Sequence, residues 1–411
     1  MRRVPTLRPR VSGSRLKKGR IGAIRRTAIR RPLLFTVVTL GAVVLMVGAA
    51  LGARELIDDG PTGPAPQTQK KLVWGLRTLP DGGSLFPAMK ELGVGIYAIQ
   101  ARWEMIAPTR RPENPRDWRD PAYEWPDYLS GALKEADQHG MEVMLMVMGA
   151  PKWANGGRPW YWNPDDPQDF ADFTYATAKR YPNVKLWKIW GEPNRMPNYR
   201  PLTPQTLEQV NDPTYELNAA QRVAPRNYSV LLDTAYEELK KENPKNIVIG
   251  GNTYTSAGED NIRPYQWLDN MRLPDGSLPR MDMWGHNPWG NERPDLDEPP
   301  SPNGTVQFSD LGRLVKALDG AGYETERGKP LKLFLSEWGV PTGFEDKDLL
   351  LEVNDESADK WIQAAFNIAD WKRIYTLGWV HLTDTDRNST GLLTEDGRPK
   401  PAFDYYKSAA N

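Results

Sequence analysis

The sequence predicts an α/β fold of the (β/α)8 TIM-barrel type, preceded by a single N-terminal transmembrane helix. Beyond residue 70, short apolar runs alternate with longer amphipathic segments, which is typical of βα units around a parallel sheet. The runs number eight, and a chain of 411 residues can hold a barrel of about 250 residues or more. An uncharged stretch near the N-terminus, residues 33–53, has the length of a membrane span.

Each expected strand is a short, mostly apolar run. The eight runs are Leu72–Leu76, Gly95–Gln100, Glu142–Met148, Leu186–Glu192, Ile247–Gly251, Met281–His286, Leu331–Glu337 and Gly378–Leu382. The amphipathic segments between them predict the helices Ser84–Gly93, Trp125–Gly140, Phe170–Arg180, Arg226–Asn243, Tyr265–Met271, Leu311–Gly322 and Ala358–Ile374. This alternation indicates one barrel domain over residues 71–411.

The N-terminal region divides into three parts. Residues 1–31 carry 12 Arg and Lys and no acid, residues 32–53 form the predicted transmembrane signal anchor, and residues 54–70 are a Pro/Gly-rich linker. The positive-inside rule places the basic arm in the cytoplasm and the barrel outside it, so we expect a single-pass protein of the cell membrane. A cleaved signal peptide, which would release the barrel as a secreted protein, is the alternative, because small residues at 49–53 are compatible with a cleavage site.

Composition excludes several function classes. Of 53 basic residues, 12 belong to the arm, so the rest of the chain carries 41 basic against 53 acidic residues, which does not favour nucleic acid as a partner. The chain has no cysteine, which removes thiolate catalysis and Cys-ligated metal, and its three histidines give no metal signature. We therefore expect no metal and no cofactor. The 16 tryptophans offer flat apolar faces of the kind that sugars stack on.

Two glutamates stand at the ends of predicted strands. Glu192 follows the run Leu186–Trp190 and precedes Pro193, which cannot continue a strand, and Glu337 closes the run that begins at Leu331. Strand ends of one barrel share a rim, so both carboxylates belong to the same face. Glycoside hydrolysis needs such a pair, about 5–5.5 Å apart for retention of configuration and about 6.5–9.5 Å apart for inversion.

The segments around these glutamates carry a family resemblance. Residues 190–194 (WGEPN) and 336–339 (SEWG) resemble the acid/base and nucleophile motifs of the clan A (β/α)8 glycoside hydrolases, similar to families 39 and 5. The resemblance implies that Glu192 is the acid/base, protonated near neutral pH, and that Glu337 is the ionised nucleophile. It also implies that Arg102 supports the nucleophile, that His286 occupies the strand-six site position and that Trp379 floors the sugar subsite.

One position departs from that pattern. The family has an asparagine before its acid/base, where this chain has Gly191. That asparagine bonds the sugar 2-hydroxyl, so Asn194, Asn252 or another group must substitute, or the substrate lacks a free 2-hydroxyl, or catalysis is weak.

Aromatic residues near strand ends are further candidates for substrate contact. They are Trp103, Trp153, Trp289 and Trp338, with Trp160 to Trp162 as an extended platform. The long loops 193–222 and 291–304 are expected to wall the cleft. His139 and His381 are interpreted as structural residues, a helix cap and a core side chain.

Together these observations predict hydrolysis of O-glycosidic bonds in a β-linked oligo- or polysaccharide, with retention of configuration. Two alternatives remain open. One is a carbohydrate-binding barrel with weak or no catalysis, and the other is a transglycosylase acting on cell wall or exopolysaccharide. The expected partners are a carbohydrate substrate and the membrane.

Overall fold

A computed structural model describes residues 63–212, 214–255, 260–298, 301, 304–343 and 353–409. No helix within these ranges is long and apolar enough to cross a bilayer. The predicted basic arm and membrane anchor lie outside them.

Eight parallel strands form a closed barrel in chain order, which confirms the predicted fold class for this part of the chain. The strands are β1 (Thr68–Trp74), β2 (Val94–Arg102), β3 (Glu142–Met148), β4 (Leu186–Ile189), β5 (Ile247–Tyr254), β6 (Met283–Asn287), β7 (Lys332–Trp338) and β8 (Ile374–Trp379). Leu72 of β1 pairs with Gly378 of β8, and this pairing closes the ring.

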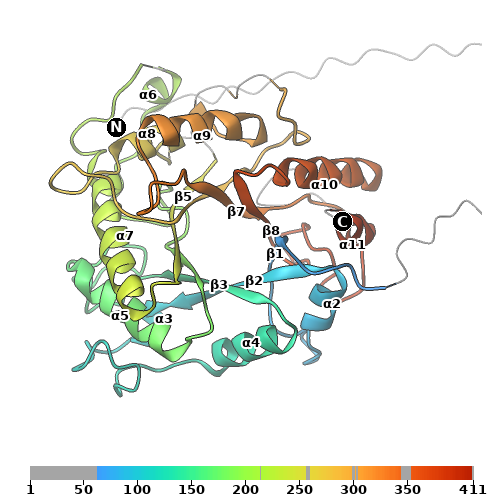
Figure 1. The fold of residues 1–411 in the computed structure, drawn as a ribbon, viewed down its shortest axis with the longest axis horizontal. Helices are drawn as coiled ribbons and strands as arrows, with labels where there is room; N and C mark the ends of the chain where they lie inside the picture. The colour runs from blue at the N-terminus through green and yellow to red at the C-terminus, as the bar shows by residue number, and fades with distance from the viewer. Residues whose placement is uncertain are drawn as a thin grey trace, which may run out of the picture. The chain divides into compact units, whose positions relative to one another are not determined.

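Helices lie outside the ring of strands (Figure 1). They are α2 (Phe86–Glu91), α3 (Trp103–Ile106), α4 (Asp127–Gln138), α5 (Pro167–Arg180), α6 (Leu207–Asn211), α7 (Val223–Glu242), α8 (Pro264–Asn270), η2 (Phe308–Asp310), α9 (Leu311–Gly320), α10 (Asp355–Ala369) and α11 (Pro401–Ser408). Local signals fix their ends. Asp166 accepts a hydrogen bond from the Gln168 amide at the start of α5, where Pro167 occupies the first turn, and Asn354 caps α10 in the same way.

The predictions for β1 and β8 are displaced furthest at their starts, by four residues each. β1 begins at Thr68, inside the predicted linker, because Ala65 is buried and bonds the Glu91 carbonyl, so the chain is already docked there. β8 begins at Ile374 instead of Gly378, because α10 ends at Ala369 and leaves a four-residue turn. As a result His381 lies beyond β8 as an exposed residue with φ +65°, and its prediction as a core side chain is wrong.

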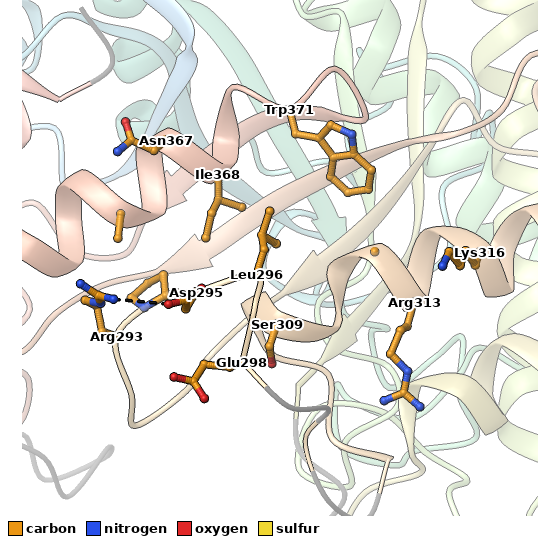
Figure 2. A pocket seen from close by; sticks show the side chains of 13 residues that line it. Arg293, Asp295, Leu296, Glu298, Ser309, Arg313, Lys316, Asn367, Ile368 and Trp371 are labelled. Atoms are coloured by element: carbon orange, nitrogen blue, oxygen red, sulfur yellow. Dashed lines mark hydrogen bonds and ion pairs between the residues drawn. The ribbon is translucent and has the colours of Figure 1, made fainter.

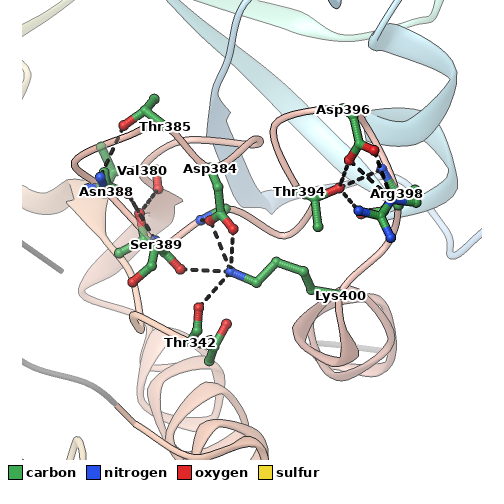
Figure 3. Close-up of polar contacts among 12 residues, drawn as sticks. Thr342, Val380, Asp384, Thr385, Asn388, Ser389, Thr394, Asp396, Arg398 and Lys400 are labelled. Atoms are coloured by element: carbon green, nitrogen blue, oxygen red, sulfur yellow. Dashed lines mark hydrogen bonds and ion pairs between the residues drawn. The ribbon is translucent and has the colours of Figure 1, made fainter. Parts of the chain in front are cut away.

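The segments after β7 and β8 are held together by one lysine. Lys400 Nζ donates to Asp384 Oδ1 and Oδ2 at 2.9 Å, and to the carbonyls of Thr342 at 2.9 Å and Ser389 at 2.8 Å (Figure 3). The Lys400 side chain is only 9% exposed. Helix α11 starts at Pro401, directly after Lys400.

We expect Lys400→Met to lower the free energy of unfolding by about 2 kcal/mol, since hydrogen bonds to a charged group are each worth about 1.5–3 kcal/mol. Arg398→Met is the matched control. It removes the neighbouring exposed pair with Asp396, also drawn in Figure 3, and should cost less than about 1 kcal/mol. Guanidinium denaturation measures the free energy of unfolding of both variants, provided that its dependence on denaturant concentration keeps the same slope. Equal midpoints for the two variants would contradict the prediction.

Candidate active site

Glu192 follows β4 in a strained backbone segment. Trp190 and Glu192 both adopt positive φ, +62° and +46°, which costs side-chain-bearing residues of the order of 1–3 kcal/mol each. Trp190 anchors the segment, because its indole N–H donates to the Asn198 carbonyl at 2.8 Å and its ring meets Tyr199 edge-on. This geometry directs the Glu192 side chain onto the carboxyl-end rim of the barrel.

The Glu192 carboxyl group is buried, with the residue 5% exposed. Its Oε1 accepts from Asn287 Nδ2 at 2.8 Å, and its Oε2 accepts from Asn198 Nδ2 at 3.0 Å and from Arg195 at 3.2 Å. Burial raises the pKa of Glu192, and the charge of Glu337 raises it further, against a smaller opposing effect of Arg195. The direction agrees with the sequence-based expectation of a protonated acid.

Glu337 lies on β7 in a different environment. Its Oε1 accepts from Lys188 Nζ at 3.0 Å, and its side chain is 21% exposed. The pairing register between β7 and β8 shifts between Leu335 and Trp338. Such irregularities re-aim side chains, and here the consecutive residues Ser336 and Glu337 both reach Lys188.

A cavity of about 520 Å³ opens beside Glu337. Its lining includes Trp74, Leu76, Met105, Tyr128 and His381. Three of these are large apolar or aromatic side chains that are exposed: Leu76 at 67%, Met105 at 53% and Tyr128 at 47%. Glu192 does not line this cavity.

A second cavity, of about 840 Å³, lies between α9, α10 and the segment after β6. Figure 2 shows Arg293 paired with Asp295, and Leu296 between the side chains of the two helices. Neither glutamate lines it. The described part of the predicted wall loop 291–304 therefore borders this outer cavity instead of the one at Glu337.

No protein-family model matches the chain, and no curated protein matches its sequence. Solved structures do match in shape. A family 39 glycoside hydrolase from Bacteroides cellulosilyticus WH2 aligns with a TM-score of 0.56 at 16% identity, over 84% of this chain and 64% of that one. A monomeric β-xylosidase from Caulobacter crescentus CB15 aligns with a TM-score of 0.56 at 15% identity, over 85% of this chain and 69% of that one. A family 39 enzyme from Xanthomonas axonopodis pv. citri aligns with a TM-score of 0.54 at 17% identity, over 84% of this chain and 67% of that one.

The chain has the fold of these enzymes. It spans just under two thirds of the length of the Bacteroides protein. These structures include family 39 glycoside hydrolases, the family whose motifs the sequence resembles.

Arg102 does not pair with Glu337, contrary to expectation. Its Nε donates to Glu104 Oε1 at 2.7 Å, and its guanidinium lies 4.2 Å from the centre of the Trp160 ring. Arg102 does line the cavity beside Glu337. Glu337 is instead bonded by Lys188, which lies within the mostly apolar run of β4.

Asn194 and Asn252 are held by the backbone. Asn194 Nδ2 donates to the carbonyls of Tyr254 and Ile262, and Asn252 Nδ2 donates to the Ile189 carbonyl, with both residues at most 1% exposed. At Gly191, an added Cβ would lie 3.0 Å from Met146 Sδ. The thioether of Met146 therefore fills the space beside Gly191.

His286 is also internal. Its ring nitrogens bond Thr253 Oγ1 at 2.8 Å and the Val306 carbonyl at 2.9 Å, so it orients the segment after β6. Neighbouring Asn287, which points to the other side of the strand, is the β6 residue that contacts Glu192. The site residue of β6 is therefore Asn287, one position after the predicted His286.

Burial depresses the pKa of His286 to about 4. Between pH 6.5 and 4 the unfolded chain therefore binds a proton that the folded chain does not, so stability falls as pH falls through this window. Relative to His286→Gln, which cannot titrate, we expect the wild type to lose up to about 3 kcal/mol more between pH 7 and 4. Urea denaturation across this range measures the difference, and parallel curves would contradict it.

The predicted tryptophans divide by exposure. Trp103, Trp338 and Trp379 are at most 2% exposed and pack edge-on or stacked against other rings. Trp153 and Trp289 are half-buried. Trp74 at the end of β1, which was predicted only as a strand residue, is the tryptophan that lines the cavity beside Glu337.

Proposed function

We propose that the chain is a retaining glycoside hydrolase acting on β-linked sugars, with Glu192 as acid/base and Glu337 as nucleophile. The observation that carries the proposal is the unequal setting of the two carboxyl groups. Glu192 is buried with a raised pKa, whereas Glu337 is bound by an ammonium group and opens on a cavity. A buried carboxyl group that can donate a proton, beside a second carboxyl group that faces open space, is the pair that acid-assisted glycoside cleavage requires.

The reaction follows from these settings. Glu337 attacks the anomeric carbon while the bond to the leaving oxygen breaks and Glu192 transfers its proton to that oxygen. Water then loses a proton to Glu192 and attacks the same carbon, which breaks the glycosyl ester and restores the Glu337 carboxylate. Because the leaving group meets Glu192, the sugar that becomes attached to the enzyme lies on the side of Glu337 and its cavity. The exposed apolar side chains at that cavity supply surfaces for sugar faces.

Covalent labelling tests the proposal. The full-length protein is incubated with activated 2-fluoro glycosides of several sugars and digested for mass spectrometry. The expected result is a stable adduct on Glu337 and none on the Glu337→Gln variant. An adduct on another carboxyl group would reassign the nucleophile, and no adduct together with turnover and inverted products would replace retention by inversion.

A carbohydrate-binding barrel without turnover is the second candidate. It is favoured by Gly191 and Met146, which leave no side-chain donor at the position before the acid/base. Saturable binding in a glycan panel, combined with neither adduct nor product, would support it over the hydrolase.

We also propose that residues 32–53 anchor the barrel on the outer face of the cell membrane. The support is the uncharged span after an arm of 12 basic residues. Retention of the full-length mass in washed membranes would agree with an anchor, whereas a soluble product beginning after residue 53 would indicate cleavage.

A further inference from the structure

Lys188 is a charged residue in the middle of the shortest barrel strand, β4, and it is 0% exposed. A buried ammonium group is costly unless it is paired and hydrogen-bonded. Lys188 Nζ donates to Glu337 Oε1 at 3.0 Å and to Ser336 Oγ at 2.7 Å, and it lies 5.6 Å from the centre of the Trp74 ring. Both hydrogen bonds of the lysine thus go to β7, the strand that carries Glu337.

The contacts of Ser336 continue to the other glutamate. The Ser336 hydroxyl donates to Asn287 Oδ1 at 2.8 Å, and Asn287 Nδ2 donates to Glu192 Oε1 at 2.8 Å. Ser336, Asn287 and Lys188 are all at most 1% exposed, so water does not compete for these bonds. One connected path of hydrogen bonds thus joins Glu337 to Glu192 through three buried side chains.

This path has a direction. The ammonium group can only donate, so the Ser336 oxygen accepts from it and its hydroxyl hydrogen turns to Asn287. The Asn287 carbonyl accepts that hydrogen, which leaves its amide N–H to point at Glu192. The charge of Lys188 therefore fixes the orientation of every group up to the Glu192 carboxyl.

We propose that Lys188 determines which of the two glutamates carries the proton, keeping it on Glu192 and leaving Glu337 free to attack. Lys188 is a positioning residue, since it acts through the two glutamates. It bonds Oε1 of Glu337 and leaves the other carboxylate oxygen, Oε2, without a contact to the ammonium group. This inference rests on the proposed function for its kinetic consequence, but its electrostatic content does not depend on turnover.

The other charged and titratable groups around the pair are few among the described residues. Arg195, from the segment after β4, bonds Glu192, and its guanidinium lies over the ring of Tyr254 from β5. Arg102 and His381 line the cavity beside Glu337. None of these groups contacts both the strand that carries Glu337 and the path to Glu192, and this distinguishes Lys188 from them.

The first test reads the proton directly. Protein labelled with glutamate enriched in ¹³C at the side-chain carboxyl is titrated by NMR, with the two signals assigned by Glu192→Gln and Glu337→Gln. In the wild type the proton shared by the pair should reside on Glu192. In Lys188→Met it should move to Glu337, because that carboxylate has lost its ammonium partner.

The second test is kinetic and uses the activated aryl glycoside of the sugar that labels Glu337. Lys188→Met should lower kcat about 100-fold with KM changed less than about threefold, and should move the acidic limb of the pH–rate profile at least about one unit upward. Ser336→Ala keeps the ion pair between Lys188 and Glu337 but removes the hydroxyl group that links Lys188 to Asn287. It should lower kcat about tenfold and leave the acidic limb of the pH–rate profile in place.

Lys71→Met is the matched control. Lys71 is also 0% exposed, but its ammonium group bonds the carbonyls of Leu92 and Lys407 instead of a carboxylate. Its removal should leave the proton on Glu192 and the pH–rate profile unchanged. Lys188→Gln keeps a neutral donor and serves if the methionine variant does not fold.

A Lys188 variant that keeps the proton on Glu192 would overturn the proposal, as would an equal shift in Lys71→Met. Absence of turnover in the wild type would instead count against the hydrolase, and the NMR titration would still decide the role of Lys188.

Discussion

Glu337→Gln is expected to lower kcat about 10⁴-fold or more, because it removes the nucleophile and leaves no group at that position able to form the glycosyl ester. The same change leaves Lys188 as a buried charge without a carboxylate, which costs about 3–5 kcal/mol of stability. Kinetics on the folded protein, together with denaturation curves, separate the two effects.

The double variant Glu337→Gln with Lys188→Met is the control. It removes both members of the pair, so it should recover much of the lost stability and none of the activity. Recovery of activity along with stability would mean that Glu337 acts through the fold and not in the reaction.

Glu192→Ala should behave differently. Loss of the acid costs about 10²–10⁴-fold for substrates with poor leaving groups and much less for activated ones, which need no proton. Equal losses on both substrate types would contradict the role of Glu192.

Trp103→Ala is expected to lower the free energy of unfolding by about 3–5 kcal/mol. Trp103 is 1% exposed and packs against Phe173, Phe170 and Trp153, with ring centres 5.3–5.8 Å apart. Its removal leaves a cavity among rigid rings that collapse poorly. Guanidinium denaturation measures the loss.

Trp160→Ala provides the comparison, since Trp160 is only half-buried and stacks on Arg102. It should cost clearly less stability than Trp103→Ala. Unchanged stability of Trp103→Ala together with weakened sugar binding would restore the stacking role predicted from the sequence.

The barrel could be predicted because strands and helices differ in hydrophobic period, and this difference is visible in the sequence from residue 71 onward. The start of β8 could not be predicted, because the residues before it contain no helix-ending signal. No glycine or proline stands between residues 360 and 377, so nothing in the sequence marks the end of α10 before Ile374.

The candidate site was predictable at the level of strand ends but not of side-chain direction. Glu192 and Glu337 stand out because a charge follows an apolar run. The choice of Asn287 over His286, or of Lys188 over Arg102, depends on which side of a strand faces the barrel and on the register shift in β7, and neither can be read from residue types.

The closure of the barrel has a consequence for how the chain acquires its structure. β1 pairs with β8, about 300 positions later, and Lys71 of β1 bonds the carbonyl of Lys407 in α11. A nascent chain therefore exposes one unpaired edge of β1 until β8 has been made. Since contacts between distant segments slow folding, the ring should form late, as a single step that joins the two ends of the domain. Shortening the chain by its final helix would then affect the first strand as much as the last.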